Sequence, residues 1–282
     1  MMVGHRAGRK GFVAAKHRSG ARRTPCQHSL APQTALPRPG APRMPHPETA
    51  PADAIAAIRR TARLAGLFYL GLAVTGLFGF LLIRARLYVA ADAAATLANL
   101  STHATLARAG IGMEMGIVLT QSLAAVCFYR LFRRVDAFAA GTLAAFGLIN
   151  AIAILGSAAL LASALAVAGD VTLAAGGDAA ATVQLLYVVS GKLWSVGAIF
   201  FGLWLVPMGR LVLHSAWMPP ALGHVLVVGG VGYVLSAFVG QTVPGLGAVA
   251  DALTIPATVG EFWMIGYLLW YGVRERPPAL QR

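Results

Sequence analysis

Three charged side chains interrupt the long apolar stretches of this sequence and are its best candidates for chemistry. Glu114, Lys192 and Glu261 each stand within a run of mostly apolar residues. A charge at the centre of a bilayer costs on the order of 3 kcal/mol on insertion scales, so such residues typically mark ion, proton or solute sites. These three residues therefore form the candidate buried cluster of the chain.

Two of the charges occur in a shared local pattern. Residues 191–197 read GKLWSVG and residues 260–266 read GEFWMIG, while residues 112–116 give the looser GMEMG. The pattern favours three helical hairpins related by a parallel repeat, although so short a match in an apolar, Gly-rich chain can arise by chance. We expect Trp194 and Trp263, which stand beside the charges, to line the same interior.

The spacing places the three charges at a similar depth. Each lies about seven to nine residues into its helix, which is roughly 10–14 Å below one membrane surface. We predict that Lys192 lies between Glu114 and Glu261 inside the bundle. A structural clamp that fixes helix register and a solute, proton or ion site would both use this arrangement, and the sequence supports them equally.

The composition is that of a membrane protein. Of the 282 residues, 57% are hydrophobic and only 12% are charged, about half the share in soluble domains. Because backbone polar groups in lipid must be satisfied within each segment, the long apolar runs predict an all-α, polytopic bundle. The approximate transmembrane spans are 64–83, 107–128, 137–161, 185–206, 222–239 and 252–271.

The basic residues give this bundle a predicted orientation. They gather before the first span, after the second and fourth, and after the sixth, so the positive-inside rule predicts that both termini are cytoplasmic. Arg84, Arg86 and Arg108 are exceptions, which we expect at the interface with their charges in water. We expect a multi-pass protein of a bacterial inner (plasma) membrane, with the lipid bilayer as its partner.

Short polar signals predict local structure between and within the spans. Asp92 can cap a short helix from residue 93 to residue 100, and Asp136 can cap the third span. Gln121, Asn150 and Gln241 can form hydrogen bonds between helices, most simply as packing contacts.

The N-terminal segment differs from the rest of the chain. Twelve of the 23 Lys and Arg residues lie before residue 64, and residues 1–57 are rich in Pro as well. This composition predicts a disordered tail over residues 1–57, and it favours Met44 as an alternative start of translation. Residues 275–282 are expected to form a second short tail. Nucleic-acid binding would need a folded basic surface with aromatic residues, so no nucleic-acid partner is expected.

Motifs of the common enzyme classes are missing from the sequence. It contains no HExxH, no GxSxG and no phosphate-binding P-loop. Cys26 and Cys127 are not expected to pair, and neither has metal-ligand spacing around it. We therefore expect no catalytic residue, no metal and no cofactor.

The membrane region, from Ile58 to Arg274, resembles the bacterial multi-pass membrane family catalogued as domain of unknown function 4386. The resemblance is carried by IRRTARLAGLFYLGLAVTGLFGFLLIRARLYV from residue 58, FYRLFRRVD from 128, AIFFGLWLVPMGRLVLHSAWMPPALG from 198 and VGEFWMIGYLLWYGVR from 259. Arg210 departs from the aromatic residue expected there. The resemblance implies about six helices and no established activity.

These observations leave three functional hypotheses open. The leading one is a non-enzymatic membrane protein of unassigned biochemical function, in which the charges fix packing. The alternative is a small-molecule or ion transporter, or its accessory, that uses Glu114, Lys192 and Glu261. An intramembrane enzyme comes third. A water-filled cavity reaching the charges would favour the transporter, and a dry interior the structural role.

Overall fold

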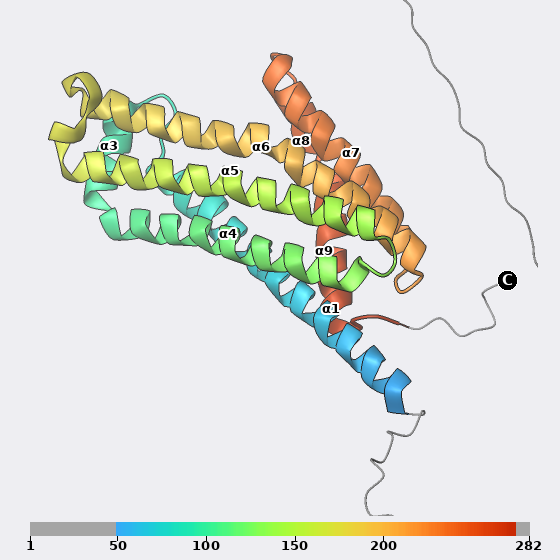
Figure 1. Ribbon diagram of the computed structural model, residues 1–282. Helices are drawn as coiled ribbons and strands as arrows, with labels where there is room; N and C mark the ends of the chain where they lie inside the picture. The colour runs from blue at the N-terminus through green and yellow to red at the C-terminus, as the bar shows by residue number, and fades with distance from the viewer. Residues whose placement is uncertain (1–48, 275–282) are drawn as a thin grey trace, which may run out of the picture. The chain divides into compact units, whose positions relative to one another are not determined.

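The computed structural model describes residues 49–274, and within that range every regular element is helical (Figure 1). The elements are α1 (Thr49–Gly76), the π-helix η1 (Leu77–Arg84), α2 (Ala85–Leu87), α3 (Ala93–Thr102), α4 (Ala104–Phe132), α5 (Ala137–Gly169), the 3₁₀ turns η2 (Val171–Leu173) and η3 (Ala175–Gly177), α6 (Ala179–Ser215), α7 (Pro220–Thr242), α8 (Gly247–Leu253) and α9 (Ile255–Trp270).

Six of these segments are long and apolar enough to cross a membrane. They are Ala54–Leu87, Ala104–Phe132, Ala137–Gly169, Ala179–Ser215, Pro220–Thr242 and Gly247–Trp270. The predicted all-α bundle of six spans is therefore confirmed. The chain is a multi-pass membrane protein whose apolar outer faces suit contact with lipid.

Several helices are longer than the apolar runs from which they were predicted. Helix α6 continues through Pro207 to Ser215, although its predicted span ended at residue 206. A proline within a helix removes its own N–H bond and its ring crowds the carbonyl four residues earlier. Buried residues on both sides of Pro207 hold the 37-residue helix together by packing. Helix α1 begins at Thr49, inside the segment predicted to be disordered. Predictions for residues 1–48 and 275–282 lie outside the described residues.

Aspartates start the helices where the sequence predicted it. Asp92 Oδ1 accepts a hydrogen bond from the Ala95 N–H at 2.8 Å, and Asp136 Oδ1 accepts one from the Ala139 N–H at 2.9 Å. Each carboxylate satisfies a backbone donor that the first helical turn would otherwise leave free. The caps of α3 and α5 are therefore confirmed.

The six spans form a closed ring at the end of the bundle where the described chain begins and ends, here called the termini end. Each span packs on the next in the sequence, and α1 closes the ring by packing on α9. Tyr69, Phe128 and Trp204 fill the centre, with ring centroids 5.6–5.7 Å apart in edge-to-face pairs. This large aromatic core fixes α1, α4 and α6 relative to one another.

Glycines bring α6 and α7 into backbone contact. A Cβ added to Gly202 would lie 2.5 Å from the Gly230 carbonyl oxygen, and one added to Gly209 would lie equally close to the Gly223 oxygen. Only residues without a side chain permit this approach. The contact continues from α7 to α9, where Gly229 faces the Ala257 backbone.

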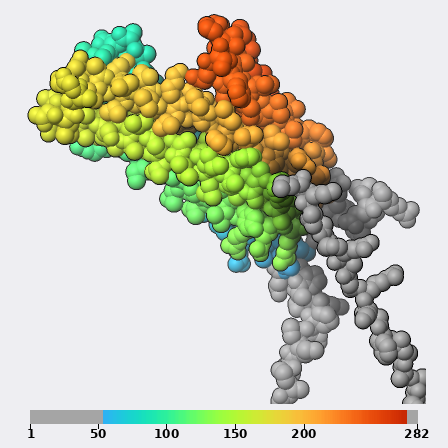
Figure 2. Space-filling model, turned by 45° about the horizontal axis from the view of Figure 1, so that its top comes forward, coloured from blue at the N-terminus to red at the C-terminus, as the bar shows by residue number. Residues whose placement is uncertain are grey.

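Past this contact the helices diverge. At the opposite end of the bundle, here called the α3 end, a second core gathers residues of α2 to α6 and none of α7 to α9: Leu87, Leu100, Ala107, Leu161, Ala164, Val167, Val183 and Tyr187. Helices α7 and α8 lean away from α6 there, and a notch separates them from it (Figures 1 and 2). The α3 end of the bundle is therefore divided into two parts, with the notch between α6 and the α7–α8 arm.

Candidate functional site: two separate carboxylates

The three predicted cluster residues lie in three different surroundings. Glu114 is 4% exposed and accepts a hydrogen bond from Trp194 Nε1 at 3.1 Å. Glu261 is half-buried and accepts one from the Tyr69 hydroxyl at 2.5 Å. Lys192 is exposed, and its Nζ donates to Gln241 Oε1 at 2.9 Å.

The predicted position of Lys192 between Glu114 and Glu261 is therefore wrong. The reason is helix rotation: residues two apart on a helix are turned by about 200°. Trp194 points from α6 into the bundle toward Glu114, so Lys192 faces the notch instead.

Trp194 and Trp263 do not share an interior either. Trp194 is half-buried and donates its indole N–H to both Glu114 and Ser157. Trp263 is 39% exposed and lies two residues from Glu261, on the outer side of α9. The local sequence repeat thus places its two tryptophans in unlike environments.

Arg84 supplies the positive charge near Glu114. It donates from Nη1 to Ser190 Oγ at 2.9 Å and from Nη2 to the Tyr187 carbonyl oxygen at 2.7 Å. Ser190 is bonded to Ser157 at 2.8 Å, and Ser157 accepts from Trp194 Nε1 at 3.1 Å. This Arg84–Glu114 network crosses η1, α4, α5 and α6.

The position of Arg84 corrects the expectation that it lies at the interface. Its guanidinium is turned into the bundle, 5.4–5.7 Å from the ring centroids of Phe80, Tyr88 and Tyr187. It stands at the end of the π-helix η1, a rare winding that often marks functional or strained positions. Gly79, on the same segment, lets η1 approach Met113 of α4 closely.

A small cavity lies between Arg84 and Glu114. Its volume is about 10 Å³, and its lining includes Gly79, Gly110 and Tyr187. Glu114 Oε2 is buried and bonds to no described residue. A space of this size suits one water molecule at most, and a bridging water would satisfy that oxygen. The surroundings of Glu114 are otherwise dry and fully packed.

Glu261 occupies a different kind of place. Tyr69, which donates its hydroxyl to Glu261, is 2% exposed and is held by the central aromatic core. Tyr233 of α7 is close enough to interact electrostatically with the Glu261 carboxylate. Along α9, Gly260 packs on Leu226 of α7, and Ala257 packs on Gly229. The carboxylate of Glu261 therefore belongs to the closed part of the bundle, on the termini side of the contact between Gly202 and Gly230.

The partners of Glu261 are neutral. Within residues 49–274 its single hydrogen bond is the one from Tyr69, and no Lys, Arg or His forms an ion pair with it. Its second oxygen is not among the buried atoms that lack a partner. A half-buried carboxylate with one free oxygen and aromatic neighbours can bind a cation or carry a proton.

Three further amides of the spans, buried Gln121 and Asn150 and exposed Gln241, form bonds between helices as predicted. Asn150 Nδ2 donates to Gln121 Oε1 at 3.0 Å, which joins α5 to α4. Gln241 accepts from Lys192 and joins α7 to α6 across the notch.

Sequence reasoning missed Arg84, Ser157, Ser190 and Tyr69 as members of these sites. Arg84 did carry a signal, because it was one of three basic residues on the wrong side for the positive-inside rule. The serines and Tyr69 carried none, since small hydroxyl residues and tyrosines are ordinary in membrane helices.

Comparison with known proteins gives one match. A family model described as domain of unknown function (DUF4386) matches residues 64–272. Neither the curated proteins nor the solved structures include a match to the chain. The matched range covers most of the described bundle and includes Glu114, Lys192 and Glu261.

Proposed function

Because this chain belongs to the DUF4386 family, whose description names no activity, we propose a function from the geometry: the protein binds an organic cation at Glu261 as a transporter or a transporter accessory. The observation that carries the proposal is a half-buried carboxylate in the membrane region whose described hydrogen bond comes from a neutral partner, Tyr69.

The chemistry of the surroundings favours a cation over an anion or a neutral solute. A carboxylate without a positive partner in an apolar setting gains from any cation that reaches it. Tyr69 bonds to the carboxylate and packs against the ring of Trp204, and aromatic faces attract cations within about 6 Å. Glu114, in contrast, already has Arg84 nearby and two helices packed over it.

A second function is favoured by the Arg84–Glu114 network. Its bonds run between protein groups and join four segments, which is what a structural clamp requires. A non-catalytic membrane component, in which the charges only fix packing, would use Glu114 in this way. The two functions differ in what they require of Glu261.

The test is binding of tetraphenylphosphonium, a lipophilic cation, to the purified full chain in lipid nanodiscs. Tetraphenylborate, an anion of the same shape, controls for partition into lipid. We expect Glu261→Gln to weaken cation binding about ten- to a hundredfold, as expected for loss of a charged partner. Glu114→Gln should leave it unchanged. Equal binding by wild type and Glu261→Gln would rule out the proposed site.

A further inference from the structure

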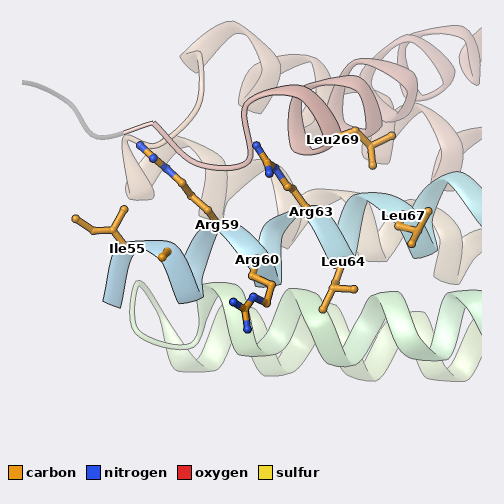
Figure 3. Close-up of a pocket in the computed structure, with 8 residues that line it drawn as sticks. Ile55, Arg59, Arg60, Arg63, Leu64, Leu67 and Leu269 are labelled. Carbon is orange, nitrogen blue, oxygen red and sulfur yellow. The ribbon is translucent and has the colours of Figure 1, made fainter. Parts of the chain in front are cut away.

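A basic groove lies at the termini end of α1, and neither Glu114 nor Glu261 is part of its lining. It has a volume of about 780 Å³ and is lined by Ile55, Ala56, Arg59, Arg60, Arg63, Leu64, Leu67 and Leu269. Arg59 and Arg63 point toward the end of α9, and Arg60 points to the other side of α1 (Figure 3). None of the lining residues is acidic.

The arginines are available to a ligand to different degrees. Arg59 Nε donates to the Val273 carbonyl oxygen at 3.4 Å and so ties α1 to the segment after α9. Arg60 and Arg63 are exposed and bond to no described residue. Guanidinium groups present rigid pairs of N–H donors that match phosphate oxygens. Arg63 points to the same side of α1 as Arg59, so its free fork can hold a phosphate group there, whereas Arg60 points away (Figure 3).

The rest of the groove is apolar and turned outward. Leu64 is 42% exposed and Leu67 is 54% exposed, and both follow directly on the arginines along α1. Residues 64–83 contain no charge, so the change from basic to apolar surface is abrupt. A ligand that fits must carry a negative charge at one end and a hydrocarbon chain at the other.

We propose that this groove binds an anionic phospholipid, with its phosphate on Arg63, beside Arg59, and its acyl chain along Leu67 toward Leu269. Basic groups at the end of a membrane span are typical of sites for anionic headgroups. Free phosphate would leave the leucines unexplained. Nucleic acid would need a wider basic surface than this groove offers. The proposal does not depend on cation binding at Glu261.

The bound lipid would also support the ring closure. Gly66 of α1 packs closely on Leu268 of α9 just beyond the groove, and Arg59 joins the two helices at their ends. A headgroup held by α1 against this junction adds contacts to the pair. We therefore expect lipid binding to raise the thermal stability of the whole bundle.

The experiment uses the purified full chain and native mass spectrometry of retained lipid. Vesicles of phosphatidylcholine alone are compared with vesicles containing equal parts of phosphatidylcholine and phosphatidylglycerol. The test variant is Arg63→Gln, which keeps the Arg59–Val273 bond and so spares the fold. The matched control is Arg60→Gln, which removes one exposed arginine that points to the other side of the same helix.

We expect the wild-type chain to retain phosphatidylglycerol over phosphatidylcholine. The groove variant should lose this preference by about fivefold or more, and the control variant should keep it. Inorganic phosphate added in detergent should protect the chain from heat less than phosphatidylglycerol does. The proposal is overturned if the groove variant retains the lipid, if both variants lose it equally, or if phosphate protects as well.

Discussion

Glu114 and Glu261 carry the same functional group at similar positions in their helices but lie in opposite kinds of surroundings. Glu114 is enclosed by η1, α4, α5 and α6, beside a cavity for at most one water molecule. Glu261 lies beside the central aromatic core and has one described hydrogen bond, from the neutral Tyr69. A buried charge in a membrane protein therefore indicates a ligand site only when it lacks partners within the protein, because a charge with internal partners needs no ligand.

The largest effect should come from removing Arg84 on the enclosed side. Arg84→Leu leaves Glu114 without a nearby positive charge and takes two bonds from Ser190 and Tyr187. We expect the free energy of unfolding to fall by about 3–5 kcal/mol, measured by thermal unfolding in detergent. Arg86→Leu, two residues along and exposed, is the control. Similar losses from the two variants would mean that the network does not stabilise this half.

Next in size is a change at the contact that holds the open side. Gly202→Leu places a side chain against the Gly230 carbonyl and Val234, so α6 and α7 must separate. We expect a loss of about 1–3 kcal/mol in unfolding free energy and a change in cation binding at Glu261. Gly141→Ala, where an added Cβ meets nothing within 4 Å, is the matched control. An unchanged variant would show that the close contact is dispensable.

A smaller effect is expected at the single partner of Glu261. Tyr69→Phe keeps the ring in the aromatic core and removes the hydroxyl. The expected cost is about 1 kcal/mol in unfolding free energy, and cation binding should persist because the carboxylate remains. Measuring both quantities separates positioning from binding. Loss of binding with no loss of stability would instead make the hydroxyl part of the cation site.

Lys192→Met should have little effect on stability. Its exposed ammonium makes one described hydrogen bond, to Gln241, and exposed charged contacts contribute about 0–1 kcal/mol. A Lys192 paired with both glutamates, as the sequence pattern predicts, would cost several times more when removed. A comparison of the thermal unfolding of Lys192→Met with that of Arg84→Leu therefore decides whether Lys192 or Arg84 stabilises the buried glutamates.

The smallest effect concerns the turn between α5 and α6. The Asp170 carboxylate accepts hydrogen bonds from the Thr172 hydroxyl and from the Thr172 backbone N–H. The hydroxyl bond first, and the backbone bond second, lower the pKa of Asp170 below its usual value near 3.8. A lowered folded-state pKa contributes stability that is full above about pH 4 and is lost as the pH falls through the folded-state value. The hydrogen-exchange protection factor of this turn, taken relative to the intrinsic rate at each pH, should fall on acidification below pH 4 in the wild type. Thr172→Val should flatten that fall, and an unchanged profile would contradict this account.

The sequence predicted the fold well because apolar length and helix caps are local signals. Residues 64–83 and the five other apolar runs are each long enough to cross a bilayer. Asp92 and Asp136 each stand directly before the first residue of a helix and predict where it begins. Neither signal depends on how the helices are rotated about their axes.

The site was harder to predict because contacts depend on rotation and on tertiary packing. Lys192 and Trp194 stand two residues apart, and only the packing of α6 decides which of them faces the interior. Arg84 enters the bundle at the end of a π-helix that no sequence pattern announced. Trp263 is exposed although Trp194, at the matching position of the repeat, is bonded inside.

The glycine contact between α6 and α7 has a mechanical consequence. Gly202 and Gly230 act as a fulcrum, and the arm from Gly230 to Gln241 is about 16 Å long at 1.5 Å per residue. A rotation of about 10° about that fulcrum would move the tip of the arm by nearly 3 Å, which is enough to break the Lys192–Gln241 bond of 2.9 Å. Exposed charged contacts contribute about 0–1 kcal/mol, so thermal motion can break this bond and release the α7–α8 arm from α6 at the α3 end.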